Sequence, residues 1–265
     1  MSTETRALAR VERSGPVAHL RIDDPERLNP LSVALAQAAT AALQSCEDDP
    51  EVRALVISGA GRAFSSGGDL ADVGARVLDG EPWARLDVMR RLQRLILALR
   101  GSRLPIVAAV SGPAYGAGWS VALACDLIVA ARDARFCQVF IRRELVPDLG
   151  SAWLLPRVVG TLRAKELMLL GDEWSADEAH AHGLINRLVE TREDAEREAM
   201  ALAQRLAARQ PAILAMAKDL INRGQSLSLE DLLKLEEQSQ AIALGAPQTL
   251  AAMRAFLDDR DDGDR

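Results

Sequence analysis

Short apolar runs alternate with longer amphipathic stretches along the first 140 residues. Apolar runs rich in β-branched residues predict buried strands over Val17–Ile22, Ala54–Ser58, Ile106–Val110, Leu127–Ala131 and Phe136–Val139. Between them, apolar residues spaced three and four apart predict helices over Val33–Cys46 and Arg85–Leu99. Strands joined by helices are typical of a parallel sheet, so the pattern predicts an α/β core.

The pattern changes after about residue 150, where strand signals nearly vanish. Helical spacing or propensity covers Leu162–Leu170, Ala176–His182, Arg192–Arg209, Ala212–Asn222, Leu229–Leu244 and Ala251–Leu257. The acidic tail Asp258–Arg265 is too polar to pack, and we expect it to fray. We therefore expect a core domain over residues 1–195 and a helical C-terminal region over residues 196–265.

Composition and charge exclude several classes of protein. The chain has 265 residues with 32 basic and 38 acidic side chains, a net charge of −6 that argues against nucleic-acid binding. Only three cysteines occur, without metal-ligand spacing, and His180 and His182 lie two apart, so we expect no metal site. Because no signal peptide and no long apolar run is present, we expect a cytoplasmic protein that does not span a membrane.

Two glycine-rich turns are the first candidates for chemistry, because each directly follows a predicted strand. The turns cover Ser58–Leu70 and Ser111–Leu123. Small residues allow the main chain to approach a ligand, and two such turns could direct two N–H donors at one oxygen. A glycine-rich turn can also serve packing alone. A nucleotide site is disfavoured, since Gly116 and Gly118 lack the third glycine of the dinucleotide motif and no phosphate-loop lysine occurs.

An ordered set of motifs resembles the enoyl-CoA hydratase/isomerase (crotonase) family from about residue 10 to residue 260. The matching segments are Asn29–Ser32, Ala63–Leu70, Ser111–Gly118, Cys125–Asp126, Leu145–Asp148 and Gly183–Asn186. The resemblance implies a crotonase (ClpP-like) α/β fold with a repeated ββα core and a helical C-terminal oligomerisation region. It further implies an acyl-CoA substrate, no cofactor, and a homotrimer or dimer of trimers.

The same resemblance assigns parts of the site. By position in the motifs, the main-chain N–H groups of Gly68 and Ala117 form an oxyanion hole for the thioester oxygen. Arg27, Arg62 and the Ala63–Leu70 loop, with Ala63, Asp69 and Leu70 as contact residues, are expected to bind CoA. The family often has lysine where this chain has Ala71, which leaves one phosphate contact open. The resemblance also implies that Trp83 and Met89 border the acyl pocket.

Acid–base residues depart from the hydratase pattern. Ser120 and Phe140 occupy the positions of the two glutamates of family hydratases, and neither can move a proton at neutral pH. We expect both to contact substrate, although Ser120 could instead bond back to the preceding turn. The pattern around Asp148 resembles the isomerase branch, where a lone Asp shuttles a proton. Asp148 could instead cap the following helix, and Glu144 is a rival acid unless it pairs with a neighbouring arginine.

These residues predict an enzyme that shifts a C=C double bond of an enoyl-CoA through an oxyanion-stabilised dienolate. One base suffices for this reaction, because it removes a proton from one carbon and returns it to another. Hydration, or another CoA-thioester reaction such as hydrolysis or decarboxylation, is the alternative within enzymes. A catalytically silent acyl-CoA-binding protein is the alternative of another class.

Overall fold

The computed structural model describes residues 7–78 and 81–263, and contacts divide the chain into two units, Met1–Arg209 and Gln210–Arg265. The expected division after residue 195 therefore lies earlier than the observed one. The reason is helix α8 (Arg192–Ala207), which buries five small or apolar side chains against the sheet and so belongs to the first unit.

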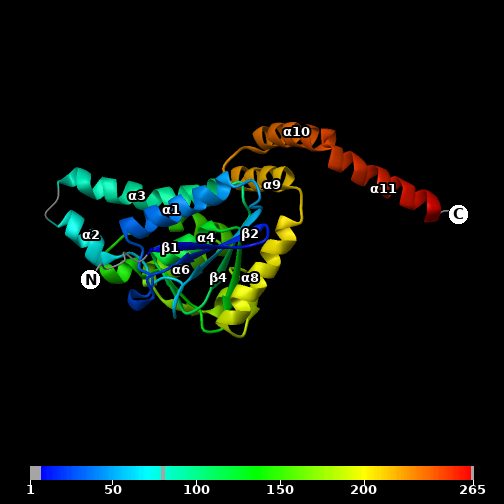
Figure 1. Ribbon diagram of the computed structural model, residues 1–265. Helices are drawn as coiled ribbons and strands as arrows, with labels where there is room; N and C mark the ends of the chain where they lie inside the picture. Colours follow the sequence, from blue (N-terminus) through cyan, green and yellow to red (C-terminus); the bar gives the residue numbers. More distant parts are fainter. Residues whose placement is uncertain (1–6, 79–80, 264–265) are drawn as a thin grey trace. The chain divides into compact units, whose positions relative to one another are not determined.

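A six-stranded sheet with strand order β1-β2-β3-β4-β6-β9 forms the centre of the first unit (Figure 1). Its strands are β1 (Ala9–Ser14), β2 (Val17–Ile22), β3 (Ala54–Gly59), β4 (Ile106–Val110), β6 (Leu127–Ala131) and β9 (Arg187–Val189). All neighbours pair in parallel except β1 and β2, which form an antiparallel hairpin. The parallel α/β core expected from the sequence is confirmed.

The central strands are buried on both faces, which explains why they read as continuous apolar runs. In β3, Ala54 and Val56 pack with α8, whereas Leu55 and Ile57 belong to the larger core on the opposite face. That larger core also contains the buried side chains of α1 (Val33–Asp48), α3 (Pro82–Gly101) and α4 (Ala117–Ala124).

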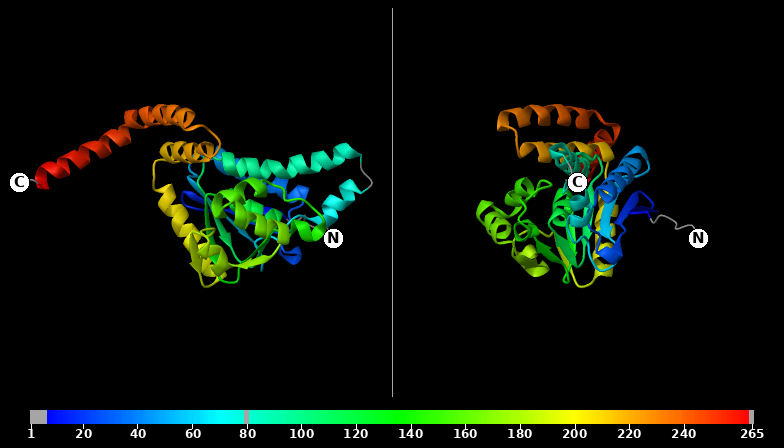
Figure 2. Two further views of the ribbon diagram at one scale, coloured as in Figure 1. Left: turned by 180° about the vertical axis from the view of Figure 1, so that it is seen from behind. Right: turned by 90° about the vertical axis from the view of Figure 1, so that its left-hand side faces the viewer.

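A second sheet of three short strands lies in the order β5-β7-β8, comprising β5 (Pro113–Tyr115), β7 (Arg135–Cys137) and β8 (Glu173–Ser175). The remaining helical elements of this unit are η1 (Pro25–Arg27), α2 (Leu70–Val77), η2 (Val139–Arg143), α5 (Ser151–Val159), α6 (Thr161–Leu170) and α7 (Ala176–Ala181). Helix α2 packs beside α3 (Figures 1 and 2).

Several elements differ from the sequence-based expectation. Strand β1 is exposed at the sheet edge and carries charged side chains, so it has no apolar run to reveal it. The strand expected over Phe136–Val139 is β7 and ends at Cys137, because Val139 begins η2. Helices α2 and α5 were not expected. All six helices predicted after residue 150 are confirmed, with ends shifted by a few residues.

The second unit consists of α9 (Pro211–Gly224), α10 (Leu229–Gly245) and α11 (Pro247–Gly263). Helix α10 packs on α9, and neither has a fully buried side chain. The tail expected to fray from Asp258 is helical as far as Gly263, because helical hydrogen bonds are local and need no packing. Asp264 and Arg265 lie outside the described residues. No described helix is long and apolar enough to span a bilayer.

Candidate active site

The two glycine-rich turns meet at the start of α4. Ser65 on the first turn donates its N–H to the Pro113 carbonyl at 3.0 Å, and its own carbonyl accepts from the Tyr115 N–H at 3.0 Å. These bonds attach the first turn to β5. As a result, Gly68 and Ala117 line the same cavity, which has a volume of about 810 Å³.

Glycine is required where the two turns touch. Gly67 has φ +105°, and a Cβ there would lie 3.0 Å from the Tyr115 carbonyl oxygen. A Cβ on Gly118 would lie 2.5 Å from Ser65 Cβ. A side chain at Gly118 would push the two turns apart, and one at Gly67 would combine a strained positive φ with a tight contact. Either would disturb the placement of Gly68 relative to Ala117.

Buried Asn29 holds the first turn from the opposite side. Its Nδ2 donates to the carbonyls of Ala60 and Ala63 at 2.8 Å, and its main-chain carbonyl accepts from the Ser65 hydroxyl at 2.7 Å. Asn29 adopts φ +55°, a left-handed conformation that Asn tolerates better than most residues. This positioning role was missed in the sequence, where Asn29 was only part of a motif.

The predicted oxyanion donors are available for a ligand. Gly68 directly precedes Asp69, the N-cap of α2, and Ala117 is the first residue of α4. Within the described part of the chain, neither N–H has a recorded acceptor. Ala117 is not among the residues with positive φ, so alanine fits this position and leaves the N–H in place. The helix dipole of α4 favours negative charge in front of Ala117.

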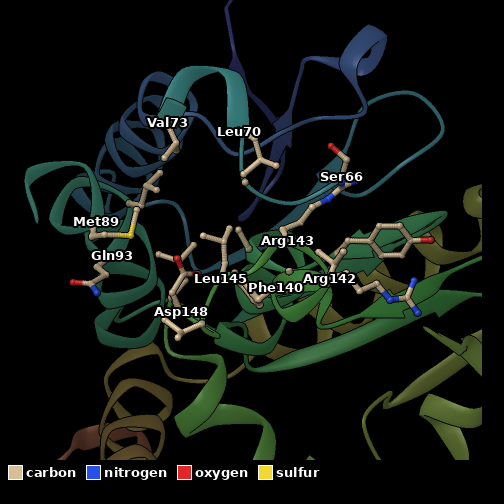
Figure 3. A pocket seen from close by; sticks show the side chains of 18 residues that line it. Ser66, Leu70, Val73, Met89, Gln93, Phe140, Arg142, Arg143, Leu145 and Asp148 are labelled. Carbon is tan, nitrogen blue, oxygen red and sulfur yellow. The ribbon is translucent and has the colours of Figure 1, made fainter. Parts of the chain in front are cut away.

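The cavity walls are mostly apolar (Figure 3). The apolar side chains that line it are Leu70, Val73, Met89, Leu92, Val139, Phe140, Leu145, Val146 and Leu149. Met89 thus borders the cavity as expected, whereas Trp83 is 72% exposed and does not line it. Polar side chains come from Ser66, Gln93, Tyr115, Arg142, Arg143 and Asp148.

Asp148 is the carboxylate of this cavity, and burial raises its pKa to about 6. Its Oδ1 is buried without a hydrogen-bond partner. The capping alternative is wrong: Gly150 is the N-cap of α5, and Asp148 contributes its main-chain carbonyl, which accepts from the Ser151 N–H at 3.0 Å and hydroxyl at 2.9 Å. The carboxyl group is therefore free for another partner.

Burial of this carboxyl predicts a pH-dependent cost to stability. Because its pKa rises from 3.8 to about 6 on folding, the folded state binds more protons in that window, and stability falls as pH rises through it. Asp148→Asn does not titrate, so we expect it to be more stable than wild type by about 3 kcal/mol near neutral pH and above. Urea unfolding should show this difference near neutral pH and little difference near pH 4. A variant that is less stable at both pH values would contradict it.

The structure separates the other predicted acid–base positions. Ser120 is fully buried, and its hydroxyl donates to the Gly116 carbonyl at 3.1 Å, so it bonds back to the preceding turn and does not line the cavity. Phe140 does line it. Glu144 is exposed, has φ +54° and lies outside the cavity lining, which removes it as a rival acid. The expected pairing of Glu144 with Arg142 or Arg143 is absent among the described residues, and Arg142 lies 3.8 Å from Asp172 instead.

The predicted CoA contacts also divide into two groups. Leu70 lines the cavity, but Ala63 is fully buried and its carbonyl is held by Asn29. Arg27 forms a 2.8 Å ion pair with buried Asp69, whose carboxylate also caps α2 by accepting from the Asp72 N–H. These two residues therefore fix the end of the loop.

The last predicted CoA contact, Arg62, lies away from the cavity, and several residues that line the cavity were not predicted. Arg62 is exposed and does not line the cavity. Ser66 lines the cavity and belongs to the Ala63–Leu70 loop that was expected to bind CoA, whereas sequence reasoning missed Val73, Gln93, Tyr115 and the arginines of η2. A helical period from Met89 to Gln93 could have indicated Gln93, but the others depend on how η2, β5 and the first turn come together.

Comparisons with known proteins agree with this architecture. A profile of the family described as enoyl-CoA hydratase/isomerase matches residues 12–262. The chain is 36% identical over 250 residues to the 1,2-epoxyphenylacetyl-CoA isomerase of Escherichia coli (strain K12), covering 94% of each protein. It is 30% identical over 254 residues to a short-chain-enoyl-CoA hydratase of Clostridium acetobutylicum, again covering 94% of each.

The fold comparison extends the agreement to three dimensions. The crystal structure of an enoyl-CoA hydratase from Polaromonas sp. JS666 superposes with a TM-score of 0.89 at 35% identity, covering 95% of this chain and 97% of that one. With the profile match over nearly the whole length, this shows the crotonase fold expected from the motifs. The chain belongs to the enoyl-CoA hydratase/isomerase family and is an acyl-CoA enzyme of this type.

Proposed function

We propose that this enzyme shifts a C=C double bond along the acyl chain of an enoyl-CoA. The observation that carries the proposal is the partly buried carboxyl of Asp148, the one carboxyl among the described lining residues of a mostly apolar cavity that Gly68 and Ala117 also line. Such a cavity supplies one proton acceptor and one site for an oxyanion, which is what a double-bond shift needs.

The proposed steps conserve atoms and electrons. The Asp148 carboxylate takes a proton from the carbon next to the thioester carbonyl of a 3-enoyl-CoA. The C–H electron pair then moves toward the carbonyl, and the Gly68 and Ala117 N–H groups donate hydrogen bonds to the resulting dienolate oxygen. Protonated Asp148 returns the proton to the far carbon of the former double bond, which gives a conjugated 2-enoyl-CoA. This sequence consumes no cofactor.

Hydration is the less favoured reaction of this cavity. It requires a group that activates water and one that delivers a proton. The two residues at the corresponding motif positions supply neither, because Ser120 is buried with its hydroxyl bonded to Gly116 and Phe140 has no ionisable group. Asp148 alone would have to perform both tasks.

Purified enzyme with a 3-enoyl-CoA in deuterated water tests the proposal. We expect a 2-enoyl-CoA of the same carbon skeleton, with no water added, and with deuterium at the γ carbon only as far as the Asp148 proton exchanges with solvent. A product heavier by one water would support hydration instead. Binding without any product from several acyl lengths would support a silent binding protein.

The rate should depend on the protonation of Asp148. The carboxylate form is the base, so we expect kcat/KM to rise with pH up to about 6, where the pKa of Asp148 lies, and to level off above it. Below this pKa the rate should fall about tenfold per pH unit. A pH series with a 3-enoyl-CoA checks this, and a flat profile between about pH 5 and pH 7 would contradict it.

An epoxide of a phenylacetyl-CoA is a second candidate substrate, because a relative 36% identical over 94% of this chain is named 1,2-epoxyphenylacetyl-CoA isomerase. The cavity of about 810 Å³ with apolar walls is large enough to admit a ring. Product analysis after incubation with this epoxide, beside a linear 3-enoyl-CoA, distinguishes the two substrate classes.

We further propose that the chain assembles as a trimer or a dimer of trimers through its second unit. Large apolar side chains on α9 and α10, among them Ile221, Leu229 and Ile242, are at least 65% exposed in a single chain. Sedimentation should give three or six times the monomer mass of 28.6 kDa. The three cysteines are buried and form no disulfide among the described residues, which supports the cytoplasmic location expected from the sequence.

A further inference from the structure

Two arginines are the cationic side chains in the mostly apolar wall of the cavity, among the residues that the structure describes. Arg142 and Arg143 end the short 3-10 helix η2, and both line the cavity. In a 3-10 helix, residues three apart lie on the same face. Arg143 therefore shares a face with Phe140, and Arg142 shares one with Val139. All four residues line the cavity. The position of both side chains is therefore set by the same turn that places Phe140.

The two arginines differ in their partners. Arg142 lies 3.8 Å from the exposed carboxylate of Asp172. For Arg143, no ion pair or hydrogen bond to another side chain is recorded within residues 7–78 and 81–263. Its cationic fork thus has all its donors available for a ligand in the cavity.

Asp148 does not neutralise this charge. Burial is the cause of the raised pKa of Asp148, and no nearby cation contributes to it. Figure 3 shows the same separation, with Arg142 and Arg143 on the Ser66 side of the cavity and Asp148 on the side of Met89 and Gln93. The cavity therefore has a cationic end and an end where proton transfer can occur.

The direction of the substrate follows from the proposed function, on which this inference rests. If the thioester oxygen lies at Gly68 and Ala117 and Asp148 reaches the acyl carbons, the acyl group occupies the Met89 and Gln93 side. The CoA portion then leaves toward the two arginines. CoA carries phosphates, and a guanidinium binds phosphate through paired N–H donors.

We propose that Arg143, with Arg142 beside it, forms an anion-binding subsite that holds a phosphate of the CoA portion of the substrate. A carboxylate at the far end of the acyl chain is the other anion that such a pair could bind. It would require the acyl group to run in the opposite direction, away from Asp148.

Binding measurements test the subsite without turnover. The probes are butyryl-, octanoyl- and phenylacetyl-CoA, which have no double bond to shift, and for the tightest binder the matching S-acyl-pantetheine, which has no phosphate. For Arg143→Gln we expect the Kd of the CoA ester to rise roughly tenfold or more, and that of the pantetheine ester to stay unchanged. Arg143→Lys should lose less, because it keeps the charge but not the fork.

A matched control and three contrary results complete the test. Arg163→Gln removes one exposed arginine outside the cavity and should leave both Kd values unchanged. Equal weakening of the CoA and pantetheine esters by Arg143→Gln would overturn the subsite, and so would failure of all three CoA esters to bind wild type. Suberyl-CoA has the chain length of octanoyl-CoA but ends in a carboxylate. If Arg143→Gln raises the Kd of suberyl-CoA more than that of octanoyl-CoA, the phosphate assignment is overturned in favour of an acyl carboxylate. Because no catalysis is measured, an absent isomerase activity with the expected Kd pattern would refute the proposed function alone.

Discussion

Asp148→Asn is expected to lower the rate of double-bond isomerisation by about 10²- to 10⁴-fold, the usual contribution of a positioned acid–base group. Asn matches Asp in size but can neither accept nor return the proton. The cavity lining has no second carboxylate among the described residues, so we expect no replacement. Steady-state kinetics with a 3-enoyl-CoA should show the loss mainly in kcat, because the neutral side chain leaves the apolar walls that hold the acyl group in place.

Glu144→Gln is the matched control for this substitution. Glu144 lies four residues earlier, is exposed and does not line the cavity, so the same chemical change there should leave the rate within about twofold. Equal rates for wild type and Asp148→Asn would contradict the proposed mechanism. A loss in Glu144→Gln as large as that in Asp148→Asn would contradict the assignment of the base.

Ala117→Pro is expected to lower kcat by about 10²- to 10³-fold, the usual cost of removing one oxyanion donor. Proline has no N–H, and Ala117 is the first residue of α4, the one helical position where proline is well accommodated. No intrahelical hydrogen bond is lost there, since the first N–H groups of a helix have no partner within it. The substitution therefore removes the donor with little disturbance of the helix.

Two further variants distinguish the effect of losing an N–H donor from the effect of disturbing the fold. Ala117→Gly keeps the N–H and should retain most of the activity. Gly68→Pro removes the other donor and should cause a loss of similar size, although it also constrains the turn before α2. Circular dichroism and the thermal midpoint show whether each variant is folded. Full activity of a folded Ala117→Pro protein would contradict the role of this N–H.

The sequence was most informative where structure depends on local pattern. The buried strands such as Ala54–Ser58 showed as apolar runs because both faces of the parallel sheet are covered. Strand β1 escaped notice because it lies at the exposed edge and is charged. Three-residue strands such as β8 are too short for any period to show.

The candidate site divides in the same way. Gly68, Ala117 and Asp148 could be selected from ordered motifs, and the structure brings all three to one cavity. Ser120 was expected to contact substrate, yet its hydroxyl bonds back to the carbonyl of Gly116, just before α4. Arg143 carried no signal in the sequence, because an arginine in a polar run reads as solvated surface.

The sequence by itself determined the α/β core and the positions of the two glycine-rich turns, since these follow from side-chain type and spacing along the chain. Its resemblance to the family's motifs placed Ser120 and Phe140 where family hydratases have glutamates. Only the tertiary structure decided that Asp148 has a partly buried carboxyl with an unpartnered Oδ1 and a pKa of about 6, that Glu144 is outside the cavity, and that two arginines lie at its other end. The physical reason is that burial and charge separation are set by segments distant in the sequence, here η2, β5 and α3, whose approach no local pattern records.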